Sequence, residues 1–204
     1  MMREGLSQLI NHSLGLTVCG EAGSGREALD LIGKLKPDLV LADISLPDTN
    51  GLDMVKNIRA MFPGTSVLVI SMHDESMYAE RVLRAGGRGY IMKQEGGRKI
   101  LEAIQRVLSG QVYVSEKMSA TLLGALSGQS GDGKTPIAQL SDREFEIFQL
   151  MGQGKGTRAI ASQLGLSVKT VETHRAAIKT KLKVQTATEL VHYAVRWVET
   201  EGKR

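Results

Sequence analysis

The sequence has few of the residues that mark secreted, membrane-spanning or single-strand-binding proteins. It holds one cysteine, Cys19, so no disulfide can form within the chain, and we expect a reducing compartment such as the cytoplasm. No run approaches 18 consecutive apolar residues, and polar residues interrupt any signal-peptide core, so no membrane partner is expected. Aromatic residues make up only 4% of the chain, which argues against recognition of single-stranded nucleic acid by base stacking.

Acidic residues are scarce in one part of the chain. The formal net charge is +4, and residues 137–204 carry this excess, because residues 1–136 contain 15 basic and 15 acidic side chains. Within the basic tail, residues 155–183 hold seven Lys or Arg residues against Glu172 alone. This density suggests a polyanionic partner, although a solvated helix with lysines near its C-terminal end would have the same composition.

The first half of the chain alternates short β-branched runs with amphipathic stretches. Apolar strands that alternate with helices indicate a doubly wound α/β fold, in which helices cover both faces of a parallel sheet. Strands are predicted at 16–20, 38–43, 66–71 and 89–92, and helices near 3–13, 24–35, 51–61, 75–85 and 96–109.

The second half contains helical patterns only. A short helix near 115–126 precedes residues 127–136, whose Gly- and Ser-rich composition is typical of a flexible linker. Capping boxes that begin at Ser141 and Thr186 predict two helix starts. Four helices are expected, at 142–152, 158–164, 168–182 and 187–199. We therefore divide the chain into an α/β domain (1–109), a linker with a short helix (110–136) and an all-α four-helix domain (137–201).

Three polar residues stand at or just beyond the carboxyl ends of predicted strands: Asp43, Ser71 and Lys93. Open parallel sheets bind their ligands at this edge. A carboxylate there can accept a phosphoryl group, a hydroxyl can donate a hydrogen bond to a phosphoryl oxygen, and a lysine can neutralise its charge. Each residue alone also has an ordinary interpretation, as a turn residue, a capping hydroxyl or a surface lysine.

Three motifs resemble, in the same order, the receiver domain of two-component response regulators. They are Leu39 to Gly51 (LVLADISLPDTNG), Val69 to Ser71 (VIS) and Gly89 to Lys93 (GYIMK). The resemblance implies a flavodoxin-like fold with strand order 2-1-3-4-5. It also implies that a sensor histidine kinase, with Mg²⁺, phosphorylates Asp43. Ser71 and Tyr90 would then be a switch pair, and Lys93 would form an ion pair with the phosphorylated Asp43.

One feature of that family does not occur in this sequence. Family members begin with a further strand that ends in two acidic residues, whereas this chain starts within the following helix, near residues 2–6. The two acids would be ligands of Mg²⁺, so we expect Asp43 to form an incomplete metal site. Either the start of the sequence is placed too late, or the receiver is altered. The alternative function is a pseudo-receiver transcription factor that acts without phosphorylation.

Residues 158–183 predict a helix-turn-helix. Gly165 can end the first helix in the left-handed conformation, and Ser167 can cap the second helix. The second helix then has one apolar side and one polar side, which is the layout of a recognition helix. Its apolar stripe consists of Val168, Val171, Ile178 and Leu182.

Residues 137–201 resemble the LuxR-type DNA-binding domain through Leu140 to Glu144 (LSDRE), Ile160 to His174 (IASQLGLSVKTVETH) and Lys181-Leu182. With the receiver in front, the whole chain resembles a NarL/FixJ-type response regulator that binds double-stranded DNA as a homodimer. For His174, packing is as good an interpretation as a phosphate contact. The resemblance implies that DNA contacts come from Lys169, Thr170, Glu172, Thr173, His174, Arg175 and Lys179, of which Arg175 and Lys179 are better placed for phosphates. Dimer contacts, or else ordinary core packing, are implied for Leu190, Val191, Ala194, Trp197 and Val198.

Enzyme alternatives fit the sequence less well. Residues 128–135 match the P-loop pattern, but a helical run precedes them and Pro136 follows, where a P-loop needs a strand and then a helix. An aspartyl-phosphate phosphatase of the haloacid-dehalogenase type would need an acid two residues after Asp43, where Ser45 stands. Ser71, His73 and Asp74 lack the G-x-S-x-G elbow of a hydrolase. We predict a transcription regulator and not an enzyme.

Overall fold

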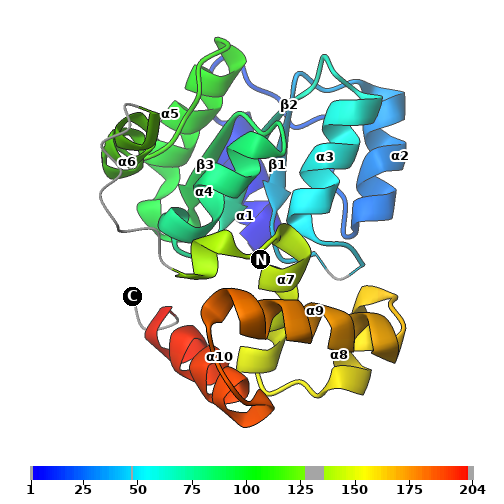
Figure 1. Ribbon diagram of the computed structural model, residues 1–204. Coiled ribbons are helices and arrows are strands. Elements are labelled where there is room, and N and C mark those ends of the chain that lie inside the picture. The colour runs from blue at the N-terminus through cyan, green and yellow to red at the C-terminus, as the bar shows by residue number, and fades with distance from the viewer. Residues whose placement is uncertain (1, 47, 127–135, 202–204) are drawn as a thin grey trace. The chain divides into compact units, whose positions relative to one another are not determined.

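The computed structural model describes residues 2–46, 48–126 and 136–201 (Figure 1). The chain forms two compact units, residues 1–122 and residues 123–204. Among the described residues, no helix is both long enough and apolar enough to span a bilayer. Pro47 of the first receiver-like motif and the P-loop-like segment 128–135 lie outside the described residues.

The first unit is built on a parallel three-stranded sheet in the order β1-β2-β3. The strands are β1 (Leu39–Asp43), β2 (Ser66–Ser71) and β3 (Gly89–Met92). The helices are α1 (Met2–Asn11), α2 (Gly25–Leu35), α3 (Gly51–Met61), α4 (Glu75–Arg84), α5 (Gly97–Leu108) and α6 (Glu116–Leu126), with a 3-10 turn, η1, at Lys93–Glu95. Figure 1 shows α4 in front of the strands and α1 behind them.

One core cluster of the first unit lies between the sheet and α5, and further buried residues lie on α3 and α4. Residues Val67 to Ile70 of β2 are all buried, as an apolar run covered on both faces should be. The buried residues of α5 recur at helical spacing and pack against Leu68, Ile70 and Ile91 of the sheet. They are Ile100, Ala103, Ile104 and Val107.

The predicted strand at residues 16–20 is wrong, whereas the three later strands are confirmed. Residues 16–20 are extended but join no sheet. In the 2-1-3-4-5 order, the strand at this place pairs only with the first strand, and residues 2–46, 48–126 and 136–201 contain no such strand. An extended segment without a neighbour has no ladder for its N–H and C=O groups. Leu16 still packs against the core.

The first unit continues past residue 109, the boundary predicted from the sequence. The Tyr113 amide donates to the carbonyl oxygen of Arg88 (3.0 Å), and the Tyr90 amide donates to the carbonyl oxygen of Tyr113 (2.9 Å). Tyr113 and Met118 are buried. The packed unit therefore extends to Met118, because Tyr113 and Met118 bury their side chains in it and Tyr113 pairs its backbone with β3.

The second unit is entirely helical. It contains a 3-10 turn, η2 (Pro136–Gln139), and helices α7 (Asp142–Gly152), α8 (Thr157–Leu164), α9 (Val168–Leu182) and α10 (Ala187–Glu201). Gly165 ends α8 with φ 63°, a left-handed conformation that favours glycine, and the Ser167 side chain caps α9 as predicted. Of the predicted apolar stripe, Val171, Ile178 and Leu182 are buried, but Val168 is 40% exposed because it stands at the start of α9.

Candidate functional site

The carboxyl end of the sheet brings Asp43 and Lys93 together. The Lys93 Nζ atom donates to Asp43 Oδ2 at 2.5 Å, although the two residues are 50 positions apart. The other carboxylate oxygen, Oδ1, accepts the backbone N–H of Ser45 at 3.0 Å. The side chain of Lys93 is 13% exposed and that of Asp43 is 32% exposed, so the carboxylate can be reached from solvent while its ammonium partner is mostly enclosed.

Ser71 ends β2, the strand beside Asp43, and Tyr90 lies on β3, the next strand of the sheet; both are fully buried. The Ser71 hydroxyl oxygen accepts the backbone N–H of His73 (3.1 Å). The Tyr90 hydroxyl donates to the carbonyl oxygen of His73 (2.8 Å), and its ring stacks on Tyr78 with centroids 6.4 Å apart. Burial raises the pKa of Tyr90, so the phenol stays protonated and remains a donor. The Tyr90 ring is thus turned into the core, and we call this position its inward arrangement.

His73 is a residue of this site that the sequence analysis considered only in a hydrolase cluster. Its Nε2 atom lies 3.4 Å from Ser45 Oγ, and its ring stacks on Tyr78 with centroids 5.1 Å apart. Burial lowers the pKa of His73, although the charge of Asp43 opposes this effect. Asp74 caps α4 by accepting the Ser76 amide (2.9 Å), so its carboxylate serves the helix. The available signal was position: His73 lies two residues after Ser71, where β2 ends.

The described residues supply one carboxylate for a metal ion at this edge. Magnesium prefers several oxygen ligands in octahedral geometry. Within the part of the chain that the structure describes, no group of three His, Cys, Asp or Glu residues could hold a metal ion. Asp48, on the loop after β1, is directed elsewhere: its carboxylate accepts the amides of Gly25 (2.8 Å) and Arg26 (3.1 Å), and these hydrogen bonds lower its pKa. The residues around Asp43 therefore do not form a magnesium cage by themselves.

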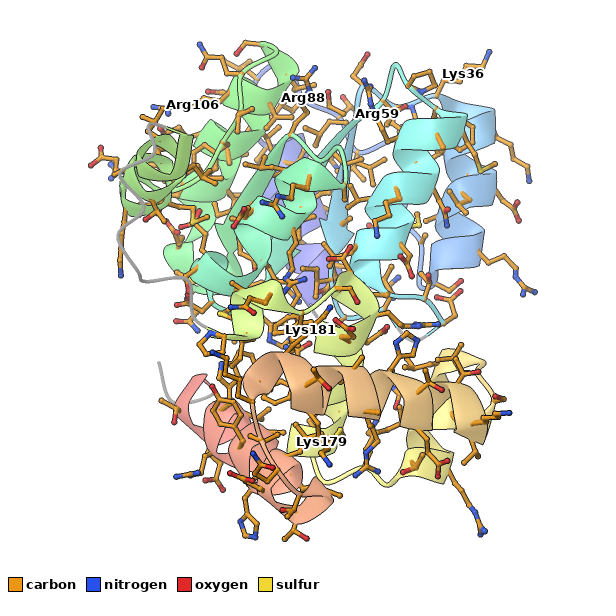
Figure 2. All side chains as sticks on the ribbon, in the orientation of Figure 1. Lys36, Arg59, Arg88, Arg106, Lys179 and Lys181 are labelled. Carbon is orange, nitrogen blue, oxygen red and sulfur yellow. The ribbon has the colours of Figure 1, made fainter. Side chains whose placement is uncertain are left out.

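Basic side chains of the first unit gather away from Asp43. Figure 2 shows Lys36, Arg59, Arg88 and Arg106 along one edge of this unit. Lys36 is the C-cap of α2, and Arg59 and Arg106 lie in the last turns of α3 and α5. Cations at helix C-termini complement the negative end of the helix dipole. The positions of Lys36, Arg59 and Arg106 therefore have a structural explanation.

The second unit exposes part of α9. Lys169, Glu172 and Thr173 are exposed, while Thr170, His174, Arg175 and Lys179 are half-buried. The Thr173 hydroxyl donates back to the Lys169 carbonyl oxygen (3.0 Å), so it already has a partner within the helix. The polar side of α9 is thus accessible over its first two turns.

Two of the basic residues on α9 are held within the second unit. Arg175 Nη1 donates to the Thr157 hydroxyl (2.5 Å), which ties α9 to α8. Lys181 Nζ donates to Glu144 Oε2 (2.6 Å), which ties α9 to α7. Figure 2 shows Lys179 and Lys181 on opposite sides of α9. Arg175 therefore has a structural role, besides the phosphate contact that the sequence implied for it.

Two of the five proposed dimer residues of α10 lie in the core of the second unit. Leu190 and Ala194 have no exposed surface, which supports ordinary core packing for them. Trp197 meets Phe145 edge-on, with ring centroids 5.5 Å apart. Val198 lies so close to Gly152 that an added Cβ there would stand 2.4 Å from its Cγ2 atom. Val191 is half-buried.

Comparison with known proteins covers both units. The model of the response regulator receiver domain matches residues 1–105, and that of bacterial regulatory proteins of the luxR family matches residues 138–194. The chain is 36% identical over 201 residues to the oxygen regulatory protein NreC of Staphylococcus aureus (strain JH9), covering 96% of this chain and 93% of that protein.

Two solved structures are similar as well. RcsB from Salmonella enterica serovar Typhimurium, bound to promoter rprA in the presence of the phosphomimetic BeF3⁻, is 25% identical with a TM-score of 0.67, over 95% of this chain and 91% of that chain. A LuxR-family two-component response regulator from Aurantimonas sp. SI85-9A1 is 28% identical with a TM-score of 0.57, over 62% of this chain and 90% of that chain.

Proposed function

The chain belongs to the two-component response regulators of the NarL/FixJ type, and on this premise we propose that Asp43 accepts the phosphoryl group and that α9 reads DNA. The protein is a transcription regulator with a receiver domain and a LuxR-type DNA-binding domain, and it is not an enzyme. The boundaries that we propose for these domains are 1–122 for the receiver and 137–201 for the DNA-binding domain.

The contact between Asp43 and Lys93 carries the first part of the proposal. A carboxylate oxygen of Asp43 attacks the phosphorus atom of a phosphohistidine on a sensor kinase, and the phosphorus–nitrogen bond breaks as the imidazole leaves. Lys93, 2.5 Å from Asp43 Oδ2, then neutralises part of the charge that the acyl phosphate brings. Receiver domains use Mg²⁺ for this reaction, and Asp43 is the carboxylate ligand that the described residues offer at this edge.

Ser71 and Tyr90 connect the acyl phosphate to the rest of the receiver. The Ser71 hydroxyl, now bonded to the His73 amide, would turn to a phosphoryl oxygen. The inward Tyr90 ring is compatible with that movement, since its hydroxyl is held by the carbonyl oxygen of His73. Phosphorylation would then change the relative populations of two conformations of the loop from Ser71 to Asp74.

The exposed side of α9 carries the second part of the proposal. The structure of RcsB, which has the same architecture, was solved with the protein bound to promoter DNA. We assign Lys169, Glu172 and Thr173 to base edges in the major groove, because all three are exposed near the start of α9. Lys179 serves a phosphate, and Thr170, His174 and Arg175 flank these contacts. We also propose that the protein binds DNA as a homodimer, with the side of α10 near Val191 as the contact.

The test is the intact mass of the purified protein after incubation with acetyl phosphate, with and without Mg²⁺, using Asp43→Asn as the control. We expect a mass gain of one phosphoryl group in the wild type only. The same samples are then titrated onto a labelled promoter fragment by fluorescence anisotropy, and phosphorylation is expected to change the affinity.

A second function is favoured by the single carboxylate at the acceptor edge. With one metal ligand in place, the receiver would act as a pseudo-receiver that controls DNA binding through a partner or through dimerisation. Absence of a mass gain, in folded protein that still binds DNA, would support this second function. A gain that persists in Asp43→Asn would place the acceptor elsewhere.

A further inference from the structure

Residues 113–118, here called the strap, pair with the β3 edge of the receiver sheet at Tyr113 and run into the first turn of α6. Gly89 and Tyr113 form a parallel bridge, with one hydrogen bond from Tyr113 to Arg88 and one from Tyr90 to Tyr113. The fit is close, since a Cβ atom added at Gly89 would stand 2.6 Å from the Tyr113 carbonyl oxygen. The strap therefore occupies a defined place on β3.

A buried carboxylate holds the other end of the strap. Glu75 is 8% exposed, and its Oε1 atom accepts the backbone N–H of Ser115 at 2.7 Å. The Ser115 hydroxyl in turn accepts a hydrogen bond from the amide of Met118 (3.1 Å), in the first turn of α6. Burying a carboxylate is unfavourable unless hydrogen bonds compensate it, so this contact holds Glu75 and the strap to each other. Glu75 is the first residue of α4.

Both anchors of the strap are adjacent to the switch. Glu75 follows the loop from Ser71 to Asp74 directly. Tyr90 touches both parts: its hydroxyl donates to His73 in the loop, and its amide donates to Tyr113 in the strap. A movement of the Tyr90 ring or of the start of α4 therefore changes the geometry at both ends of the strap.

We propose that the strap is the element through which the receiver transmits its state, because the inward arrangement of Tyr90 and the docked strap stabilise each other. The docked strap sets where α6 begins, and α6 leads the chain toward the DNA-binding unit. This inference rests on the proposed function, since the signal that acts on Tyr90 is the phosphoryl group on Asp43. By reciprocity, phosphorylation should protect the docked strap, and an undocked strap should weaken the response to phosphorylation.

The experiment uses the full chain and compares Glu75→Ala, which removes the acceptor, with Glu75→Gln, which keeps an oxygen in place. Glu80→Ala is the matched control, because it also removes a carboxylate from α4, but one that is 39% exposed and paired with Arg84 of the same helix. Intact mass is measured first for each protein. We then measure the hydrogen exchange of the strap amides, and the ratio of the DNA affinities with and without acetyl phosphate.

We expect the strap amides of the wild type to exchange more slowly after phosphorylation. In Glu75→Ala they should exchange about tenfold faster, and the ratio of DNA affinities should fall to within about twofold of one, while the phosphoryl gain is unchanged. Glu75→Gln and Glu80→Ala should stay near the wild type in this ratio. A Glu75→Ala protein that is phosphorylated and keeps the wild-type ratio overturns the inference.

Tyr90→Phe tests the coupling without any phosphate. It removes only the hydroxyl that holds the inward ring to His73, so the strap amides should exchange about fivefold faster than in the wild type. Unchanged exchange overturns the inference even if no protein gains a phosphoryl group. A wild type without a mass gain, but with faster exchange in Tyr90→Phe, contradicts the proposed function and retains the coupling.

Discussion

In the receiver unit the residues assigned to signalling are held by protein partners, whereas in the DNA-binding unit the residues assigned to base contacts face solvent. Asp43 is bonded to Lys93, and Tyr90 is fully buried with its hydroxyl on His73. Lys169 and Glu172, in contrast, are exposed on α9. A receiver must change its own shape, so its functional groups are linked to the core. A recognition helix presents groups to an outside partner, so its functional groups can change without changing the fold.

The same contrast divides the basic residues of the DNA-binding unit. Residues 155–183 contain seven Lys or Arg residues, but Lys155, Arg175 and Lys181 donate to groups of their own unit. Fewer cations are therefore available to DNA than the seven Lys and Arg residues of this segment suggest. The side of the helix on which each cation lies decides its use. The predictions below are designed to separate structural from functional residues in this unit.

Leu190→Ala should have the largest effect, because Leu190 is fully buried between α10 and the rest of the unit. Loss of its side chain leaves a cavity and should lower the free energy of unfolding by about 2–5 kcal/mol. Urea unfolding followed by the fluorescence of Trp197, which packs on Phe145, measures this directly. Val191→Ala, at a half-buried neighbour, is the control. Normal stability with a weaker dimer would instead return Leu190 to the dimer interface.

Glu144 should make the DNA-binding unit sensitive to acid. Burial raises its pKa, but hydrogen bonds from Lys181 and Ser141 outweigh burial, so its pKa lies below the usual value of 4.5. A lowered pKa in the folded state means that the carboxylate adds stability above pH 4.5 and loses that contribution as the pH falls through the lowered value.

The matched variant for this prediction is Glu144→Gln, studied by urea unfolding from pH 7 down to acid pH. It should lose about 1–2 kcal/mol at pH 7, since Lys181 is 38% exposed and solvent screens the pair. Its remaining stability should depend less on acid than that of the wild type. An equal acid dependence in both proteins would show that other carboxylates cause the effect.

Lys179→Ala and Lys181→Ala compare two lysines on opposite sides of one helix. Lys179→Ala should change the free energy of unfolding by less than about 0.5 kcal/mol but weaken binding to every DNA sequence, and it should reduce the salt slope of binding by about 0.9. Lys181→Ala should do the reverse, because its ammonium is bonded to Glu144. Anisotropy titrations at several salt concentrations, with unfolding curves, check both. Identical salt slopes in the two variants would contradict this assignment.

Thr173→Ala should have the smallest overall effect. Its hydroxyl is bonded to the Lys169 carbonyl oxygen, so we assign the contact with DNA to its methyl group. We expect unchanged stability and an unchanged salt slope, with a change of about 1 kcal/mol in preference at one base pair. Competition binding against a library of promoter variants measures this. A uniform loss across all sequences would mean that Thr173 contacts the backbone.

Local patterns in the sequence were sufficient to locate most of the elements. The apolar run from Val67 to Ile70 predicts a buried strand, and the capping box at Ser141 predicts the start of α7, because these signals act within a few residues. The order of the motifs also placed Asp43 and Lys93 at one edge, since parallel strands bring their carboxyl ends together. The extended segment 16–20 is the exception, because a strand needs a neighbouring strand and a local pattern contains no information about one.

By itself, then, the sequence determined the family, the helices, three strands and the residue types at the two sites. The tertiary structure alone decided which of those residues are free to act. The sequence alone does not distinguish the roles of Lys179 and Lys181. Only the packing of α9 against α7 gives Lys181 a carboxylate partner, Glu144. Leu190 fits a dimer surface or a core equally well until its burial is known. The link from Glu75 to Ser115 spans 40 residues, and no local pattern predicts it. Partners that lie far apart in the chain become neighbours only through the fold, so these assignments depend on the fold.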